Sequence, residues 1–330
     1  MNRRFLIIGS NSFSGSNLIN HLLKNKKNKI IGFSRSKELS SLYLNYKKSK
    51  NIKNFKFYKI NLSETNKMVN IINSYKPNYL INYAAQGMVN ESWIKPQDWY
   101  LTNIVYQSQL YQELINKKFL KKIVHFSTPE VYGSTSLKIK ENFNFNPSTP
   151  YAISRAATDL HLKRLQENYG LPIIFTRAAN VYGSCQQLYR IIPKTIISFK
   201  SKKKIEIHGN GKSIRSFIHI NDVNIAIEKI LKKGKVGQTY HISNVEKISI
   251  YSLIKQIAKI MNVDLKKNIK FVDDRKGKDK IYDLSSLKLK RQLLWKPKIK
   301  LSEGLNETIS WIDKNIKLLN KESLNYKHKK

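Results

Sequence analysis

Tyr151 and Arg155 have the residue types and the spacing for taking a proton from an alcohol. They are four residues apart at the start of a predicted helix and so lie one turn from each other, where the cation can stabilise a phenolate on the tyrosine. Thr128 and Glu130 follow the strand before this helix and add a hydroxyl and a carboxylate. The four together predict a catalytic site, because a tyrosine and a cation alone occur on many helices by chance.

A glycine-containing loop after the first predicted strand has the form of a dinucleotide-binding turn. Gly9 and Gly15 bracket the sequence GSNSFSG, and a helix follows. Glycines there permit a tight turn and let a pyrophosphate approach the backbone amides at the start of the helix. Ser12 stands where such a loop normally has a further glycine. Its position after the first strand and before a helix predicts a dinucleotide site.

The end of the second predicted strand indicates which dinucleotide would bind. NAD sites usually have a carboxylate there, which binds the ribose hydroxyls. Here the strand ends with Ser34, Arg35 and Ser36. An arginine between two hydroxyls suits a 2′-phosphate, so we expect NADP in preference to NAD, with a solvated arginine as the alternative.

The alternation of apolar runs and helical patterns predicts an α/β fold, with a Rossmann-type doubly wound parallel sheet. Apolar, β-branched runs predict strands at 5–8, 29–33, 55–60, 79–83, 122–126 and 172–176. Apolar residues at spacings of three and four predict helices at 16–26, 64–75, 103–117 and 151–169. Ligands bind at the carboxyl ends of such strands.

Beyond Thr176 the pattern is irregular, with one further amphipathic helix near 250–261. We expect a smaller mixed C-terminal substrate-binding domain there. The expected dinucleotide-binding domain comprises residues 1–180 and about 213–243. The nucleotide-sugar-binding domain would comprise 181–212 and 244–330.

The composition is that of a soluble globular protein, with 41% hydrophobic and 25% charged residues among 330. No apolar run approaches the roughly 18 residues of a membrane span, and no signal-peptide pattern opens the chain, so we expect a cytoplasmic protein. Cys185 is the single cysteine, and the seven histidines have no metal-ligand spacing. We therefore expect neither a disulfide nor a metal site.

The net charge of +39 first suggests a nucleic-acid-binding protein. Only ten of the 61 basic residues are arginine, however, and the lysines are spread along the whole chain. Recognition of phosphates and bases usually favours the bidentate fork of arginine. We therefore interpret the lysines as solvated surface residues and expect no specific nucleic-acid binding.

Several separated motifs resemble the extended short-chain dehydrogenase/reductase family of NAD-dependent epimerases and dehydratases, in particular nucleotide-sugar 4,6-dehydratases that act on dTDP-glucose. The resemblance covers nearly the whole chain. The motifs that carry it are Ala84-Ala85-Gln86, Asn103, STPEVYG at 127–133, Tyr151, RAANVYG at 177–183, RSFIH at 215–219, DRKGKD at 274–279 and WKP at 295–297.

The resemblance implies a reaction at C4, C5 and C6 of a hexose. Tyr151 would be the base at the 4-hydroxyl, Thr128 would bond the 4-oxygen, and Glu130 would remove the C5 proton. Arg155 would lower the pKa of Tyr151 and hold the nicotinamide ribose. The product would be a 4-keto-6-deoxy sugar, with the hydride from C4 returned to C6.

The resemblance also implies the binding residues and the partners. A nucleotide-diphosphate sugar would be the substrate, with NAD or NADP tightly bound, in a homodimer formed through helices 103–117 and 151–169. The cofactor would contact Gly9, Ser12, Phe13, Gly15, Arg35, Ser36, Asn61, Leu62, Ala84, Ala85, Gln86, Asn103, Ser127, Tyr151, Arg155 and Ala178. The substrate would contact Gln86, Thr128, Asn180, Arg190, Ile205, Ile207, Arg215 and Arg275.

Besides Ser12 and the pair Ser184-Cys185, which replaces a common proline-containing turn, three positions depart from the family pattern and leave alternatives open. Pro129 replaces the aspartic acid that protonates the leaving hydroxyl, Arg155 replaces a lysine, and Asn61 replaces an aspartate that meets the adenine. GDP-mannose 4,6-dehydratases also lack that acid, and UDP-glucuronate decarboxylases share the Thr-x-Glu pattern. A GDP-mannose 4,6-dehydratase, a UDP-sugar 4-epimerase, a UDP-glucuronate decarboxylase and a non-catalytic dinucleotide-binding protein are the alternatives.

Overall fold

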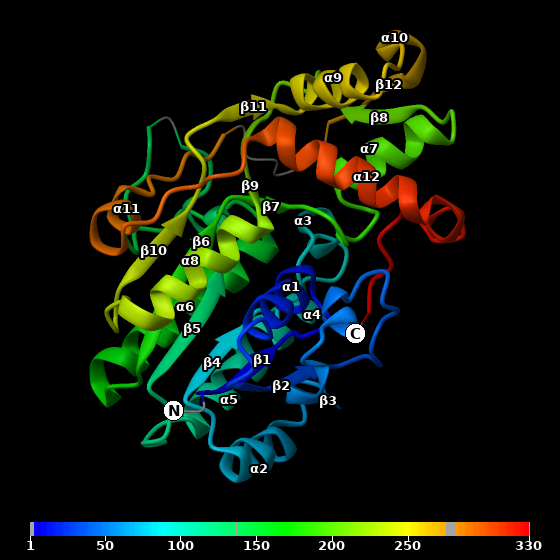
Figure 1. Ribbon diagram of the computed structural model, residues 1–330. Helices are drawn as coiled ribbons and strands as arrows, with labels where there is room; N and C mark the ends of the chain where they lie inside the picture. The colour runs from blue at the N-terminus through cyan, green and yellow to red at the C-terminus, as the bar shows by residue number, and fades with distance from the viewer. Residues whose placement is uncertain (1–2, 136, 275–280, 330) are drawn as a thin grey trace.

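A seven-stranded parallel sheet forms the centre of the larger lobe (Figure 1). The computed structural model describes residues 3–135, 137–274 and 281–329. Across the sheet the order is β10-β6-β5-β4-β1-β2-β3, and every neighbouring pair is parallel. The strands are β1 (Arg3–Ile8), β2 (Asn28–Ser34), β3 (Phe55–Lys59), β4 (Tyr79–Asn82), β5 (Lys122–Ser127), β6 (Ile173–Ala178) and β10 (Thr239–Ile242). The predicted Rossmann-type fold is confirmed.

Helices cover both faces of this sheet, which explains why its strands are apolar on both sides. On β1, Phe5 and Ile7 belong to one buried cluster, whereas Leu6 and Ile8 belong to the other. This alternation follows from the two-residue period of a strand. The first cluster lies beneath α1 (Phe13–Leu22), α8 (Ile220–Lys233) and α11 (Leu287–Leu293), and the second beneath α2 (Thr65–Tyr75), α5 (Tyr106–Glu113) and α6 (Pro150–Tyr169).

A smaller lobe is built mostly from the second half of the chain (Figure 1). Its core lies among α7 (Ile191–Lys200), α9 (Ile250–Ile260) and α12 (Leu301–Leu319). Two short sheets accompany these helices, β12-β8 and β11-β9-β7. Their strands are β7 (Asn180–Tyr182), β8 (Ile205–His208), β9 (Ile214–His219), β11 (Lys247–Ser249) and β12 (Ile269–Val272), and a short helix, α10 (Leu265–Asn268), precedes β12.

The predicted helix near 250–261 corresponds to α9, whereas α7 and α12 have no counterpart among the predicted elements. The segment 213–243 contributes α8 and β10 to the larger lobe, but its β9 pairs with β7 and β11. We propose the domain division expected from the sequence, with 213–243 completing the dinucleotide-binding domain. Within the described residues, every helix is too short or too polar to cross a membrane.

Two predicted helices differ in their limits from the observed ones. Instead of one helix at 103–117, the structure has α4 (Pro96–Tyr100), a π-helical turn (Leu101–Val105) and α5, preceded by α3 (Val89–Ser92). Pro96 starts α4 because the first helical position needs no backbone N–H donor. The helix predicted at 16–26 begins earlier, at Phe13, because Ser12 caps it.

A buried ion pair joins α6 to β6. Asp159 Oδ2 accepts hydrogen bonds from Arg177 Nη2 at 2.8 Å and Nε at 3.2 Å, and both side chains are fully buried. Arg177 Nη1 donates to the Tyr132 hydroxyl at 2.7 Å. The guanidinium also lies 4.8 to 5.1 Å from the ring centroids of Tyr132, Phe143 and Phe145. Removing either charge would leave the other one buried without its counterion.

We predict that Asp159→Asn lowers the free energy of unfolding by about 3 to 5 kcal/mol, because Arg177 stays buried and charged. Urea denaturation followed by circular dichroism measures this change. Glu167→Gln is the control on the same helix, since Glu167 pairs with Lys163 and Arg164 at the surface, and such pairs contribute little. Equal stability of Asp159→Asn and the wild type would contradict the structural role of this pair.

Candidate active site

Two adjoining cavities lie at the carboxyl ends of the parallel strands, where ligands bind in this class of sheet. The Tyr151 cavity has a volume of about 670 Å³. The Asn61 cavity has a volume of about 730 Å³. Ser12, Arg35, Tyr83, Ala85, Tyr189 and Tyr326 line both cavities. A single ligand can therefore extend from one cavity into the other.

Most of the residues predicted from the sequence line these cavities. In the Tyr151 cavity lie Phe13, Gln86, Ser127, Thr128, Glu130, Tyr151, Arg155, Ala178, Asn180, Arg190, Ile205, Ile207 and Arg215. In the Asn61 cavity lie Gly9, Ser36, Asn61, Leu62 and Ala84. Gly15 and Asn103 line neither of them. Arg275 lies outside the described residues.

The loop after β1 approaches its neighbours too closely for side chains at two positions. Gly9 has φ +85°, and a Cβ there would lie 2.9 Å from the backbone nitrogen of Ala84. At Gly15, a Cβ would clash with the carbonyl oxygen of Gly9. Neither position therefore has room for a side chain. Glycine at position 15 also lets α1 pack closely on the loop.

Ser12 replaces the further glycine expected in this loop, and its backbone explains why a side chain is tolerated there. Its φ of −70° and ψ of 158° are extended. The Ser12 hydroxyl accepts a hydrogen bond from the amide of Gly15 at 3.0 Å and so caps α1. Asn11, which was not among the predicted site residues, donates from Nδ2 to the carbonyls of Ser36 and Lys37. It fixes the loop against the end of β2.

Arg35 lies at the end of β2, as expected, but its guanidinium is already engaged. Nη1 donates to the carbonyl of Lys329 at 2.8 Å, and Nη2 donates to Gln86 Oε1 at 3.3 Å. Glu38, the nearest carboxylate along the chain, accepts a hydrogen bond from the Tyr46 hydroxyl instead. Among the described residues that directly follow β2, Arg35 is therefore the charged one that lines the cavities.

Asn103 positions the site from behind its wall. It is fully buried on the π-helical turn. Its Oδ1 accepts from the amide of Gln86 at 2.7 Å, and its Nδ2 donates to the Gln86 carbonyl at 3.0 Å and to Ser154 Oγ at 2.9 Å. Asn103 thus holds the backbone of Gln86 and lines neither cavity, and its expected contact with a cofactor stays a prediction.

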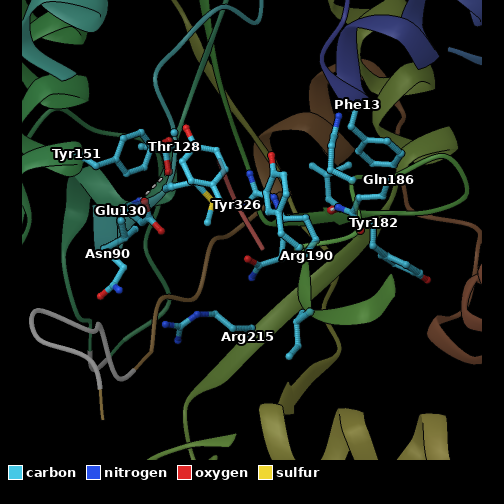
Figure 2. A pocket seen from close by; sticks show the side chains of 18 of the residues that line it. Phe13, Asn90, Thr128, Glu130, Tyr151, Tyr182, Gln186, Arg190, Arg215 and Tyr326 are labelled. Atoms are coloured by element: carbon cyan, nitrogen blue, oxygen red, sulfur yellow. Dashed lines mark hydrogen bonds between the residues drawn. The ribbon is translucent and has the colours of Figure 1, made fainter. Parts of the chain in front are cut away.

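Thr128, Glu130 and Tyr151 come together at one side of the Tyr151 cavity (Figure 2). Thr128 caps the short turn 129–132, and its hydroxyl acts on the phenol of Tyr151. Burial raises the pKa of Tyr151 above its usual 10.0, and the charge of Glu130 raises it further. Arg155, Thr128 and Arg190 act in the opposite direction. In this structure the lowering expected from Arg155 is outweighed by burial.

Arg155 presents two hydrogen-bond donors to a ligand. Its Nη2 donates to the carbonyl of Phe126 at 2.6 Å and lies 3.2 Å from His125 Nε2. Its Nε and Nη1 are buried, and neither has a partner among the described residues; the same holds for the Ser127 hydroxyl. Because unpaired buried donors are rare, these atoms indicate that a polar ligand group binds here. They fit the hydroxyls of a ribose, and the glycine loop fits a pyrophosphate.

The opposite wall of the Tyr151 cavity is basic and apolar. Arg190 lies at the start of α7 with its guanidinium 5.3 Å from the ring centroid of Tyr189. The guanidinium of Arg215 lies 4.6 Å from the centroid of Tyr282. Ile205 and Ile207 on β8 contribute the apolar part. Such a wall suits a diphosphate next to a flat base.

The sequence did not reveal the contribution of Tyr189 and Tyr326 to both cavities. Tyr189 precedes the predicted Arg190, so its position was a usable signal. Tyr326 lies far along the chain, after α12, and no motif marks it. In Figure 2 its ring lies between the Thr128 group and Arg190.

His125 supports Arg155 and should make the stability of the fold depend on pH. Burial, with the charges of Arg155 and Arg177, holds the pKa of His125 well below its usual 6.5. The folded protein keeps this ring neutral, whereas the unfolded chain binds a proton below about pH 6.5. Stability should therefore fall as the pH decreases, by up to about 1.4 kcal/mol per pH unit for this histidine.

We predict that His125→Gln reduces the slope of the unfolding free energy against pH by up to about 1.4 kcal/mol per pH unit, because an amide does not bind a proton in this range. Urea unfolding of both proteins at pH values from about 7 to 5 measures the slope. Contributions of the other titrating groups cancel in the difference. Equal slopes in the two proteins would contradict a neutral, buried His125.

Comparison with known proteins places this geometry in a family. The chain is 30% identical to the dTDP-glucose 4,6-dehydratase of Haemophilus influenzae over 93% of this chain and 96% of the relative. It is 31% identical to a trifunctional UDP-glucose 4,6-dehydratase, epimerase and reductase of Arabidopsis thaliana over 95% of this chain, which spans 47% of that longer protein.

A solved structure agrees with these relatives. The dTDP-glucose 4,6-dehydratase DesIV of Streptomyces venezuelae, solved with NAD and TYD bound, superposes with a TM-score of 0.87 at 25% identity. The superposition covers 94% of this chain and 97% of that one. The family model described as GDP-mannose 4,6 dehydratase matches residues 6–308. The chain therefore belongs to the GDP-mannose 4,6-dehydratase family.

Proposed function

We propose that the protein is a nucleotide-sugar 4,6-dehydratase, which converts a nucleotide-diphosphate hexose into its 4-keto-6-deoxy form. One observation carries the proposal: Thr128, Glu130, Tyr151 and Arg155 line a single cavity. The dehydratases among the relatives support the same reaction.

The order of the steps follows from the acidity of the sugar. A C5 hydrogen is not acidic until C4 becomes a ketone, so oxidation at C4 comes first. Tyr151 takes the proton of the 4-hydroxyl while Thr128 holds the 4-oxygen, and Arg155 stabilises the phenolate. A nicotinamide dinucleotide, when bound, supplies the hydride acceptor for C4 and the hydride donor for C6.

Glu130 then has to act first as a base and then as an acid, because Pro129 cannot donate a proton. Its carboxylate removes the C5 proton once C4 is a ketone. The same carboxyl group, now protonated, gives that proton to the C6 hydroxyl, which leaves as water. When the hydride returns to C6, C5 takes up a proton that Glu130 has acquired from solvent. The proton that Tyr151 took from the 4-hydroxyl is released to solvent, so the protons balance over the whole cycle.

The basic wall opposite Tyr151 supports binding of the diphosphate. Asn180, Arg190 and Arg215 lie on that wall, and each offers hydrogen-bond donors to phosphate oxygens. Ile205 and Ile207 would border the nucleobase. We propose these five residues as the substrate-binding set, together with Gln86 and Thr128.

We also propose that the dinucleotide carries a 2′-phosphate. The Asn61 cavity is lined by Arg35, Lys321, Lys327 and Lys329, with Glu322 as an opposing charge. No carboxylate follows β2 toward the cavity among the described residues, and a basic wall favours a phosphate over bare ribose hydroxyls. Arg35 would exchange its hydrogen bond to the Lys329 carbonyl for one to the phosphate.

A homodimer completes the proposal. Helices α4 to α6 carry exposed apolar side chains, among them Leu101, Val105, Ile153 and Leu160 at 39 to 43% exposure. Such side chains support an interface between two copies. The cytoplasmic location and the absence of specific nucleic-acid binding stay predictions from the sequence.

We predict that Glu130→Gln reduces the overall rate by about 10² to 10⁴, because the swap keeps the shape and removes the base. A panel of dTDP-, UDP- and GDP-hexoses, followed by mass spectrometry for loss of water, first identifies the substrate. Glu303→Gln, at an exposed carboxylate on α12 that lines neither cavity, is the matched control and should change the rate by less than about threefold.

Deuterium distinguishes the roles of Glu130 and Tyr151. The wild type should incorporate solvent deuterium at C5, whereas Tyr151→Phe should neither exchange C5 nor oxidise C4. Wild-type dehydration by Glu130→Gln would show that another group is the base. Release of carbon dioxide from a UDP-uronate, or inversion at C4 without loss of water, would replace the proposed reaction with decarboxylation or epimerisation.

We predict that Arg35→Asp weakens binding of NADP by about 10- to 100-fold and changes binding of NAD much less, because a carboxylate repels the 2′-phosphate. Isothermal titration calorimetry measures both affinities. Arg291→Asp changes the same charge on the exposed surface of α11 and is the control. Tighter binding of NAD than of NADP by the wild type would overturn the proposed preference.

A further inference from the structure

Residues 321–329, here called the strap, cross from the smaller lobe to the larger one. In Figure 1 the chain leaves α12 and descends toward α1 and β2. Leu324, Tyr326 and His328 are half-buried, whereas the residues between them are exposed. This period of two is that of an extended chain with one face against the protein.

Each of the three half-buried side chains of the strap contacts a different part of the protein. Leu324 packs on the core of the smaller lobe. The ring of Tyr326 meets Tyr189 edge-on, with the centroids 5.2 Å apart. His328 stacks on Trp99 with 5.0 Å between centroids and 8° between planes. The strap is thus fixed at both lobes and at the point where it crosses between them.

A hydrogen bond to a carboxylate fixes the end of the strap on α4. His328 Nε2 lies 2.7 Å from Asp98 Oδ2, and the side chains are 24% and 14% exposed. Trp99, which receives the imidazole ring, donates from Nε1 to the carbonyl of Gly87 at 2.8 Å. The strap therefore rests on the same loop that carries Gln86.

The strap also bonds directly to two proposed cofactor residues. Gln86 Nε2 donates to the carbonyl of Lys329 at 2.7 Å and lies 3.1 Å from His328 Nδ1. Arg35 Nη1 donates to the same carbonyl at 2.8 Å. These bonds hold the strap against the rim of the site.

The strap forms one wall of the Asn61 cavity. The glycine loop, Asn61 and Leu62 lie on the side of the large sheet, and Lys321, Asn325 and Tyr326 are among the strap residues that close the cavity. Tyr326 lines the Tyr151 cavity as well. A ligand that extends from one cavity into the other would therefore lie next to Tyr326.

We propose that the strap is part of the dinucleotide site and retains the bound cofactor, so that release requires His328 to leave Trp99 and Asp98. This inference rests on the proposed function. A dehydratase that returns its hydride to the product has no need to exchange the cofactor in each cycle, so slow release is compatible with turnover. Tyr326 and His328 are positioning residues in this proposal.

The experiment measures the rate at which cofactor leaves the full-length protein. NADPH or NADH is bound, an excess of the oxidised dinucleotide is added, and the fall of the fluorescence is followed by stopped flow. We expect His328→Ala to release the cofactor about tenfold faster, because it loses a stacking contact and a charge-assisted hydrogen bond. Thermal unfolding of each variant verifies that it is folded.

His21→Ala is the matched control. His21 Nε2 lies 2.8 Å from Glu228 Oε2, with exposures of 19% and 36%, and neither residue lines a cavity. Its release rate should equal that of the wild type. Unchanged release from His328→Ala, equal acceleration in both variants, or tighter binding after His328→Ala would each overturn the retaining role.

A second measurement separates this inference from the proposed function. Amide hydrogen exchange of residues 325–329 should slow when NADP or NAD is bound. Exchange that is unaffected by bound cofactor contradicts the inference and leaves the dehydratase proposal standing. A wild-type protein that binds neither dinucleotide contradicts the proposed function first, and the inference with it.

Discussion

The active site depends on a cluster of buried charges between β5, β6 and α6. Arg155 and Arg177 both lie close enough to His125 to lower its pKa, and Asp159 pairs with Arg177. Since His125 stays neutral, this group has one more positive than negative charge. Arg155, which lines the Tyr151 cavity, places this additional positive charge next to the site. Burying it is unfavourable unless a negative group forms nearby, and a phenolate on Tyr151 is such a group.

The remaining geometry follows from where parallel strands end. Strands β1, β2 and β5 end at the same edge of the sheet, so the glycine loop, Arg35 and the pair Thr128 and Glu130 lie near one another although they are far apart in the sequence. The smaller lobe closes the opposite side with Arg190 and Arg215. The cleft therefore belongs to both lobes, and contacts between them shape it.

The strands and the grouping of Thr128, Glu130, Tyr151 and Arg155 at one cavity could be predicted because their signals are local. Strands buried on both faces form short apolar runs, and Tyr151 with Arg155 is a spacing within one helix. Helix α7 escaped because Pro193 and β-branched residues obscure it, although proline is tolerated in a first turn. Gly304 similarly interrupts the pattern of α12, where a Cβ would clash with the Tyr182 hydroxyl. The contacts of Tyr326 and the net shift of the Tyr151 pKa depend on distant residues, which no local pattern contains.

The π-helical turn at Leu101–Val105 has a consequence for how this region tolerates insertions and deletions. Such a turn contains one residue more than an α-helical path between the same ends. Deleting one residue there would give a plain α-helix between the same ends, so α4 and α5 would keep their relative orientation. Gln107 and Tyr111 would keep their hydrogen bonds to Asn82, whereas Asn103 would lose the position from which it holds the backbone of Gln86. The additional residue in this stretch therefore serves the placement of Asn103, and the helices on either side do not need it.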